Sequence, residues 1–300
     1  RRMYAGAGFT DPYVVDTNGD LRNEVIFLEG AGGLVNLDAV TATQRLAPRV
    51  NWRRWLGLPY YWHPLNLDRA GLWEFLTVDD SQAPTYTLNL VTIDPANGTT
   101  TVLGSGVITN APGWPELHAV GQFNGSGADD VVISEGGWAA PARALAWTGS
   151  SFAQIWRQIG FSHVSRPGAV SDVNSDGRDD LAMAAGGEFR LVDGSSGNTL
   201  AYSVIEWTPQ AILANLDSDS TPEVLYIATV NGHIRVAEFT PAFPIAFTRQ
   251  ITGTCCHIGA VADVSLSEPG LEIVYRTQDG VLGTMSGING SDIYTRGLGV

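Results

Sequence analysis

A polar loop that ends in an acidic residue and runs directly into an apolar stretch occurs six times in this chain of 300 residues. In the complete copies, oxygen-bearing side chains stand at the first, third, fifth and ninth positions, and the seventh position offers its backbone carbonyl. Alternate residues of a tight loop point the same way, so this spacing brings about five oxygens to one point, where Ca²⁺ takes six to eight at about 2.3–2.6 Å. We call these segments the acid loops, and the last residue of each its closing acid. They span residues 16–24, 66–74, 122–130, 172–180, 215–223 and 263–272.

Three of the acid loops carry a complete set of oxygen side chains. Their predicted calcium ligands are Asp16, Asn18, Asp20 and Glu24; Asp172, Asn174, Asp176 and Asp180; and Asn215, Asp217, Asp219 and Glu223. The 122–130 loop is a weaker match, and its predicted ligands are Asn124 and Asp130. The 66–74 loop has Ala70 at its fifth position, and the 263–272 loop has one extra residue, so both are expected to be empty. We therefore expect about three to four structural Ca²⁺ ions.

The alternative interpretation of the acid loops is purely conformational. Asp, Asn and Gly are favoured in turns because they tolerate unusual backbone angles and their side chains accept hydrogen bonds from nearby N–H groups. Three complete oxygen sets at one spacing favour the calcium interpretation over this one.

The spacing of the acid loops indicates the elements that position them. The closing acids stand at residues 24, 74, 130, 180, 223 and 272. One repeat therefore takes about 50 residues, which is typical of a four-stranded β-propeller blade. Each acid loop leads into a β-rich apolar stretch, and turns with the composition of hairpin loops follow at residues 94–98, 193–197 and 286–290.

The repeat predicts the architecture of the whole chain. We expect an all-β fold, a β-propeller of six four-stranded blades that forms a single domain over residues 1–300, with seven blades as the alternative. The stretch from the last closing acid round to the first is about one further repeat long, so the N- and C-terminal segments are expected to share a blade and close the ring.

The acid loops also carry a family resemblance. The run Asp172-Val-Asn-Ser-Asp-Gly-Arg-Asp-Asp180-Leu resembles the FG-GAP/VCBS repeat of integrin α-type propellers, and it is similar to the repeats of certain propeller lectins. The resemblance extends over all six repeats and is specific in three of them. It implies that the ions are structural, because in that family they make the blades rigid and take no part in chemistry. Most relatives of this kind have seven blades.

A second group of residues precedes each expected innermost strand. These segments are rich in aromatic residues and histidine, and the candidate ligand-binding residues in them are Trp62, His63, Trp114, His118, Trp207 and His257. Aromatic rings beside polar groups suit sugars, because a ring stacks on the C–H face of a sugar while polar neighbours hold its hydroxyls. Two alternatives stay open: the aromatic residues could pack between blades, or the histidines could converge to bind a transition metal or act as acid and base.

Composition narrows the classes of partner. The formal net charge is −14 and basic residues are few, which argues against nucleic acid. No apolar run reaches the roughly 18 residues needed to span a bilayer. The adjacent Cys255 and Cys256 could be free or could close a vicinal disulfide. Millimolar calcium outside the cell would keep the acid loops filled, so an extracellular, secreted or cell-surface location is expected.

These features together predict a binding or adhesion module that recognises glycans or an extracellular protein partner. One alternative is a carbohydrate-active enzyme, either a polysaccharide lyase or a hydrolase, that uses the histidines. Another is a structural or assembly module of a larger surface protein. The sequence shows no phosphate-binding glycine loop and no nucleophile elbow, so an enzyme is the less favoured class. It leaves the oligomeric state open.

Overall fold

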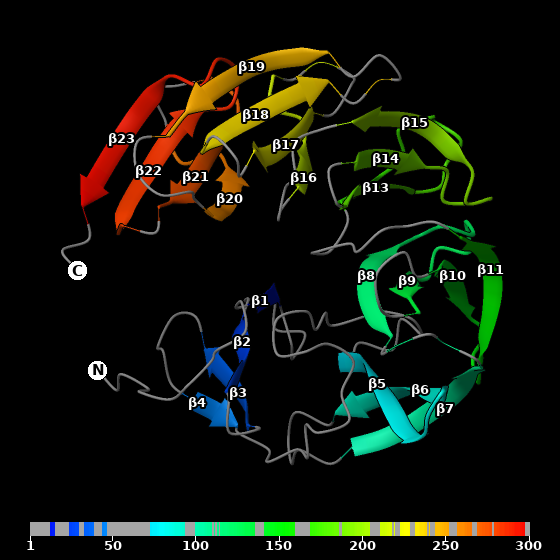
Figure 1. Ribbon diagram of the computed structural model, residues 1–300. Helices are drawn as coiled ribbons and strands as arrows, with labels where there is room; N and C mark the ends of the chain where they lie inside the picture. Colours follow the sequence, from blue (N-terminus) through cyan, green and yellow to red (C-terminus); the bar gives the residue numbers. More distant parts are fainter. Residues whose placement is uncertain are drawn as a thin grey trace. The chain divides into compact units, whose positions relative to one another are not determined.

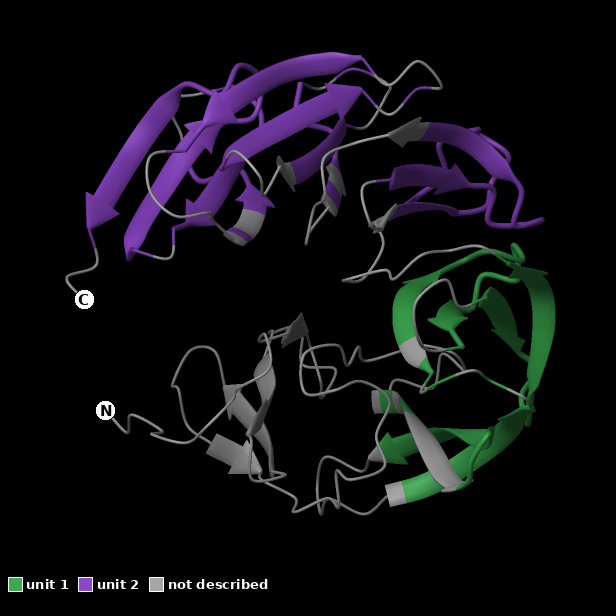
Figure 2. Cartoon of the chain, viewed as in Figure 1, with its two compact units in different colours: residues 1–161 green, residues 162–300 purple. Residues whose placement is uncertain are grey.

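The structure of the chain is a computed structural model. It describes residues 13–15, 24–29, 33–38, 44–46, 73–93, 100–109, 111, 113, 115–135, 141–159, 169–185, 188–204, 211–217, 219, 223–228, 232–238, 240, 244–251, 257–265, 269–277 and 279–297. The chain divides into two compact units, residues 1–161 and residues 162–300, which have different colours in Figure 2. The prediction of a single domain over residues 1–300 stays a prediction.

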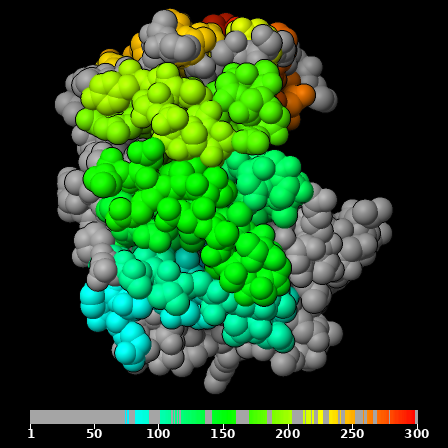
Figure 3. Space-filling model, turned by 90° about the vertical axis from the view of Figure 1, so that its right-hand side faces the viewer, coloured from blue at the N-terminus to red at the C-terminus, as the bar shows by residue number. Residues whose placement is uncertain are grey.

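The described strands of the first unit form three antiparallel sheets (Figure 1). Sheet A contains β1 (Tyr13–Val15), β2 (Glu24–Glu29), β3 (Gly33–Asp38) and β4 (Gln44–Leu46). Sheet B contains β5 (Trp73–Gln82), β6 (Thr85–Ile93) and β7 (Thr100–Ile108). Sheet C contains β8 (Glu116–Gly121), β9 (Asp130–Ser134), β10 (Ala142–Trp147) and β11 (Phe152–Gln158). Strand β11, in green, lies at the molecular surface in Figure 3.

The second unit has three sheets of four strands each among its described residues. Sheet D contains β12 (Ala169–Ser171), β13 (Asp180–Ala185), β14 (Glu188–Val192) and β15 (Thr199–Val204). Sheet E contains β16 (Ala211–Ala214), β17 (Glu223–Ala228), β18 (His233–Glu238) and β19 (Ile245–Gln250). Sheet F contains β20 (His257–Ala262), β21 (Glu272–Arg276), β22 (Val281–Ser286) and β23 (Asp292–Gly297).

Every sheet is a meander in which the strands pair in chain order. In the five four-stranded sheets, an acid loop joins the first strand to the second, and a hairpin joins the third to the fourth. In an antiparallel meander these two connections lie at the same end of the sheet, which we call the acid-loop end. The connection between the second and third strands lies at the other end, as does the segment that enters the first strand; we call this the entry end.

Where their side chains are described, apolar residues after the closing acids contribute to the cores of the two units. In β9, Val131, Val132 and Ile133 are fully buried. Strand β18 alternates instead, with Ile234 and Val236 buried and His233 and Arg235 partly exposed. Such alternation is typical of a strand that presents one face to a core, and fully burying one aliphatic side chain of this size contributes about 1.5–3 kcal/mol.

Two of the three expected hairpin turns lie in the described residues, and both are confirmed. Gly197 N–H donates to the Asp193 carbonyl oxygen at 2.8 Å, and Gly290 N–H donates to the Ser286 carbonyl oxygen at 2.9 Å. Both glycines have positive φ, 75° and 70° respectively, a backbone conformation that residues with a Cβ rarely adopt. The third turn, at residues 94–98, lies outside the described residues.

The expected sharing of a sheet by the two ends of the chain is not seen among the described strands. Strands β1–β4 form sheet A and β20–β23 form sheet F, and each sheet takes its strands from one continuous stretch. In the described part of the chain, no helix has the length and apolar character needed to cross a membrane.

Candidate metal centre

Each closing acid stands at the start of a strand. Glu24, Asp130, Asp180, Glu223 and Glu272 are the first residues of β2, β9, β13, β17 and β21, and Glu74 is the second residue of β5. Five of the six are at most 2% exposed, and the side chain of Glu24 lies outside the described residues. An ionised carboxylate is costly to bury unless it is hydrogen-bonded, paired or bound to a metal, so each of these side chains needs partners.

In four sheets the closing acid accepts hydrogen bonds from the backbone of its own loop. Asp180 accepts from Val173 N–H at 3.1 Å and from Asn174 N–H at 3.3 Å. It also accepts from Gly194 N–H at 3.1 Å, which joins the acid loop to the hairpin turn at the same end of sheet D.

The same arrangement recurs in the other sheets. Asp130 accepts from Asn124 N–H at 2.8 Å, and Glu272 accepts from Val264 N–H at 2.7 Å. Glu223 accepts from Leu216 N–H. Because the 263–272 loop behaves like the others, the closing acid fastens its loop whether or not the loop has a complete set of predicted ligands. Asp130, Asp180 and Glu223 were predicted as calcium ligands, whereas Glu272 was not, because its loop was expected to be empty.

The remaining predicted ligands of the 172–180 loop also accept backbone hydrogen bonds. Asp176 N–H donates to Asp172 Oδ1 at 3.1 Å and to Asn174 Oδ1 at 2.9 Å. Gly177 N–H donates to Asp172 Oδ2 at 2.9 Å. Side-chain oxygens at the first and third positions thus accept hydrogen bonds from the backbone N–H groups of the fifth and sixth residues. These are the contacts that the turn interpretation predicts. They leave the calcium prediction untested.

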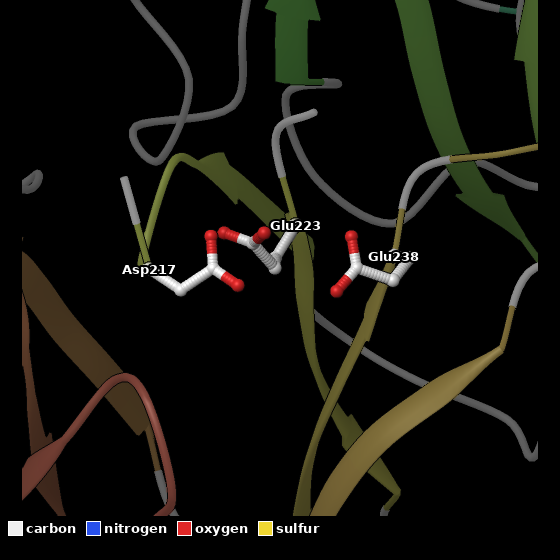
Figure 4. Close-up of side chains that lie close together, drawn as sticks. All are labelled: Asp217, Glu223 and Glu238. Carbon is white, nitrogen blue, oxygen red and sulfur yellow. The ribbon is translucent and has the colours of Figure 1, made fainter. Parts of the chain in front are cut away.

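Three carboxylates meet at the acid-loop end of sheet E. One oxygen each from Asp217, Glu223 and Glu238 lies within 4.8 Å of the other two (Figure 4). Asp217 is exposed and Glu238 is partly buried, whereas Glu223 is 2% exposed and its Oε1 has no hydrogen-bond partner. Asp217 and Glu223 were predicted as ligands. Glu238 was not, and it comes from β18, where it stands directly opposite Glu223.

Burial and mutual repulsion both act on this cluster. Burial first, and then the charges of Asp217, Glu238 and Asp219, raise the pKa of Glu223 to about 7 against the hydrogen bond from Leu216 N–H. Burial and the two aspartates also raise the pKa of Glu238. A divalent cation between the carboxylates would favour their ionised forms. The donor set is all oxygen, which suits Ca²⁺ or Mg²⁺ and not a thiolate- or imidazole-preferring metal.

The other predicted residues are placed as follows. Asp16, Asn18, Asp20, Trp62, His63, Trp114 and Trp207 lie outside the described residues, as does the side chain of His257. His118 lies in β8 and is 3% exposed. Its burial does not favour contact with a ligand at the surface.

A cavity of about 460 Å³ lies beside sheets E and F, lined by residues of β19, β21, β22 and β23. Its lining includes Arg249, Tyr275, Asp292 and Arg296, together with Thr277 and Thr295. Arg249 forms an ion pair with Asp292, and Arg296 is exposed. None of these residues was predicted to bind a ligand, because nothing in their local sequence marks them.

No protein-family model matches the chain, and no curated protein sequence matches it. Among solved structures it is similar to BamB from Moraxella catarrhalis, with a TM-score of 0.53 and 15% identity over 97% of this chain and 73% of that one. It is similar to the β-propeller domain of Cps50 (Swd1) from Myceliophteria thermophila, with a TM-score of 0.59 and 14% identity over 99% and 88%. It is also similar to BBS1N, which was solved in complex with ARL6DN. The TM-score is 0.61, and the identity is 10% over 98% of this chain and 84% of that one. The meander sheets and these similarities support a β-propeller.

Proposed function

We propose that this chain is an extracellular binding module, a six-bladed β-propeller stabilised by Ca²⁺ in its acid loops, and that it recognises a glycan or a protein partner. A propeller fold supports a binding or scaffold role in general, although the fold alone does not fix a function. Among the similar structures, BBS1N was solved with a protein partner. The six described sheets correspond to the six repeats in the sequence.

The observation that carries the calcium proposal is the cluster of Asp217, Glu223 and Glu238. Its oxygens lie within 4.8 Å of one another, and one oxygen of the buried Glu223 has no hydrogen-bond partner. The 172–180 and 215–223 loops share the predicted ligand spacing. Sensor and extracellular calcium sites range in Kd from about 10⁻⁷ to 10⁻³ M, and the weaker sites fill only at the calcium concentrations found outside cells. This is the argument for an extracellular location.

Thermal unfolding with and without calcium tests this proposal. An ion that binds only the folded state stabilises it by about 2.7 kcal/mol at 100 times its Kd, so we expect 1 mM CaCl₂ to raise the Tm clearly above its value in EDTA. Excess MgCl₂ with EGTA is the matched control for ionic strength and divalent charge. Equal melting temperatures in CaCl₂ and in EDTA would contradict calcium binding.

A glycan array probed in calcium and again after EDTA treatment tests the ligand class. A defined sugar signal that chelation abolishes would support glycan recognition. The first variants to examine would then be Trp62→Ala, Trp114→Ala and Trp207→Ala, followed by Arg296→Ala in the cavity of the second unit. A silent array would favour a protein partner instead.

A further inference from the structure

The residue that stands opposite each closing acid on the neighbouring strand differs between the sheets. We call it the cross-strand partner. The register pairs Glu24 with Asp38, Glu74 with Thr92, Asp130 with Ala146, Glu223 with Glu238, and Glu272 with Ser286. In sheet D the register pairs Leu181 with Val192. The next pair in the same register is Asp180 and Asp193, so Asp193 stands opposite Asp180.

Acidic cross-strand partners occur in the sheets whose acid loops have complete oxygen sets. Asp38, Asp193 and Glu238 accompany the 16–24, 172–180 and 215–223 loops. The three loops with incomplete sets have threonine, alanine or serine at this place. The loop pattern and the cross-strand partner lie on different segments of the repeat, so their agreement is an independent sign that these three sheets share a function.

An acid opposite an acid has an electrostatic cost that calls for a counter-ion. Directly opposite residues of an antiparallel pair have Cβ atoms about 4.5–5.5 Å apart, and like charges there are destabilising. Among the described residues, no ion pair joins Glu223 or Glu238 to a basic side chain. The buried Glu223 Oε1 has no hydrogen-bond partner in this cluster. Glu272 Oε1 also has none, but the uncharged Ser286 faces it and no repulsion arises there.

The cross-strand acid reaches the acid loop in sheet D as well. Asp193 Oδ1 accepts from Ser196 N–H at 2.7 Å, which fixes the hairpin turn. Its Oδ2 faces the loop, where it accepts from Asn174 Nδ2 at 3.4 Å. The same amide nitrogen donates to Asp180 Oδ1 at 3.4 Å. One predicted calcium ligand thus lies against both carboxylates.

We propose that the cross-strand acid is a further ligand of the bound cation and determines which blades bind one: Glu238 together with Asp217 and Glu223 in sheet E, with Asp38 and Asp193 in the equivalent places of sheets A and D. This rests on the proposed calcium binding. The cation lies between the acid loop and the third strand, so it links two segments of the repeat that the loop ligands alone would not join. The 122–130 loop, opposite Ala146, stays empty.

The test counts the Ca²⁺ ions bound by the full chain, by equilibrium dialysis or native mass spectrometry, and measures their affinities by calorimetry. Glu238→Gln is expected to weaken one site by about tenfold or more, because affinity depends on the number of charged ligands. The matched control is Glu188→Gln on β14, a partly buried acid that pairs with Arg190 away from the acid loops. This control should bind like the wild-type chain.

A melt in EDTA separates a ligand from a merely structural residue. Glu238→Gln removes one of the repelling charges, so without calcium the variant should be at least as stable as the wild-type chain, and it should gain less from added calcium. Ala146→Asp is the converse variant and should add a calcium site to sheet C. If the wild-type chain binds calcium and Glu238→Gln binds it equally well, the cross-strand proposal is overturned while the calcium proposal stands. If the wild-type chain binds none, the calcium proposal itself fails.

Discussion

At the scale of single residues, the closing acid combines a structural contact with a place in the candidate metal centre. Asp180 accepts three backbone N–H groups, two from its own loop and one from Gly194. Asp176, in contrast, is exposed, and its carboxylate accepts from Arg178 N–H at 2.9 Å. The two side chains belong to one predicted ligand set, but only Asp180 is buried and joins the acid loop to the hairpin turn.

Two substitutions in the 172–180 loop separate these roles. In EDTA, Asp180→Ala is expected to lower the free energy of unfolding by about 2–3 kcal/mol, because it leaves three backbone donors, of which Gly194 N–H is buried, without their acceptor. Asp176→Ala should cost less than about 1 kcal/mol there, because its hydrogen bond is exposed to water. In calcium the loss for Asp176→Ala should grow. Urea unfolding under both conditions measures these differences, and equal losses in EDTA would show that the closing acid does not fasten the loop.

The buried Glu135 gives a prediction about pH dependence. It follows β9 and is 0% exposed, and it accepts from Arg143 Nε and from Arg157 Nε, each at 2.7 Å. Burial would raise its pKa, but the hydrogen bonds and charges of the two arginines outweigh burial and hold the pKa below the ordinary value of 4.5. Its ionised form therefore stabilises the fold above about pH 4.5. That contribution is lost as the pH falls from about 4.5 through the lowered pKa of Glu135 in the folded state.

Glu135→Gln should accordingly lower the free energy of unfolding at pH 7. The expected loss is about 2 kcal/mol, below the range for a fully buried pair, because Arg157 is 37% exposed. The difference between variant and wild type should shrink as the pH falls below about 4.5. Chemical unfolding at a series of pH values measures this. A difference that stayed constant from pH 7 to pH 3 would show that the ion pairs do not contribute.

At the scale of the elements, the sequence predicted where strands begin but not which residues face each other. An acid loop is a strong start signal, because its closing acid is followed at once by an apolar stretch, and the second strands begin there. The cross-strand partner follows its closing acid after a variable interval: Glu238 stands fifteen residues after Glu223, and Thr92 stands eighteen after Glu74. Hairpin length sets the register, so Glu238 could not be assigned to the cluster from spacing alone. The cavity residues were missed for the same reason, since they come together only through pairing and packing.

Register also explains a glycine in sheet F. Gly283 stands opposite Tyr275, and a Cβ at this glycine would lie 2.2 Å from Tyr275 Cζ and 2.4 Å from its Oη. Tyr275 is 4% exposed in the core of the second unit. Its ring has little room to move, so Gly283→Ala should destabilise the protein by about 1–3 kcal/mol through overpacking.

Gly297→Ala is the matched control for this prediction. Gly297 is the last residue of β23, and a Cβ there would meet no atom within 4 Å. We expect its effect on stability to lie within about 0.5 kcal/mol. Thermal or urea unfolding compares the two variants, and equal stabilities would contradict the packing of Tyr275 over Gly283.

At the scale of the whole molecule, the repeat concentrates negative charge in the acid loops. The acid loops account for much of the net charge of −14. The cavity of the second unit, with its two arginines, is lined by none of the predicted calcium ligands. Cation binding and ligand binding are therefore proposed at separate sets of residues. Calcium can support the ligand site only through the stability of the blades.

Hydrogen exchange tests this division across all repeats in one experiment. Amide groups exchange when local structure opens, so a bound ion should slow exchange in the loops that hold it. We expect calcium, compared with EDTA, to protect peptides that cover the 172–180 and 215–223 loops and, from the sequence, the 16–24 loop. The 263–272 loop is the internal control, because its closing acid makes the same backbone hydrogen bonds but faces the uncharged Ser286. Equal protection of the 263–272 loop would show that calcium acts on the fold as a whole and not through the loops with acidic cross-strand partners.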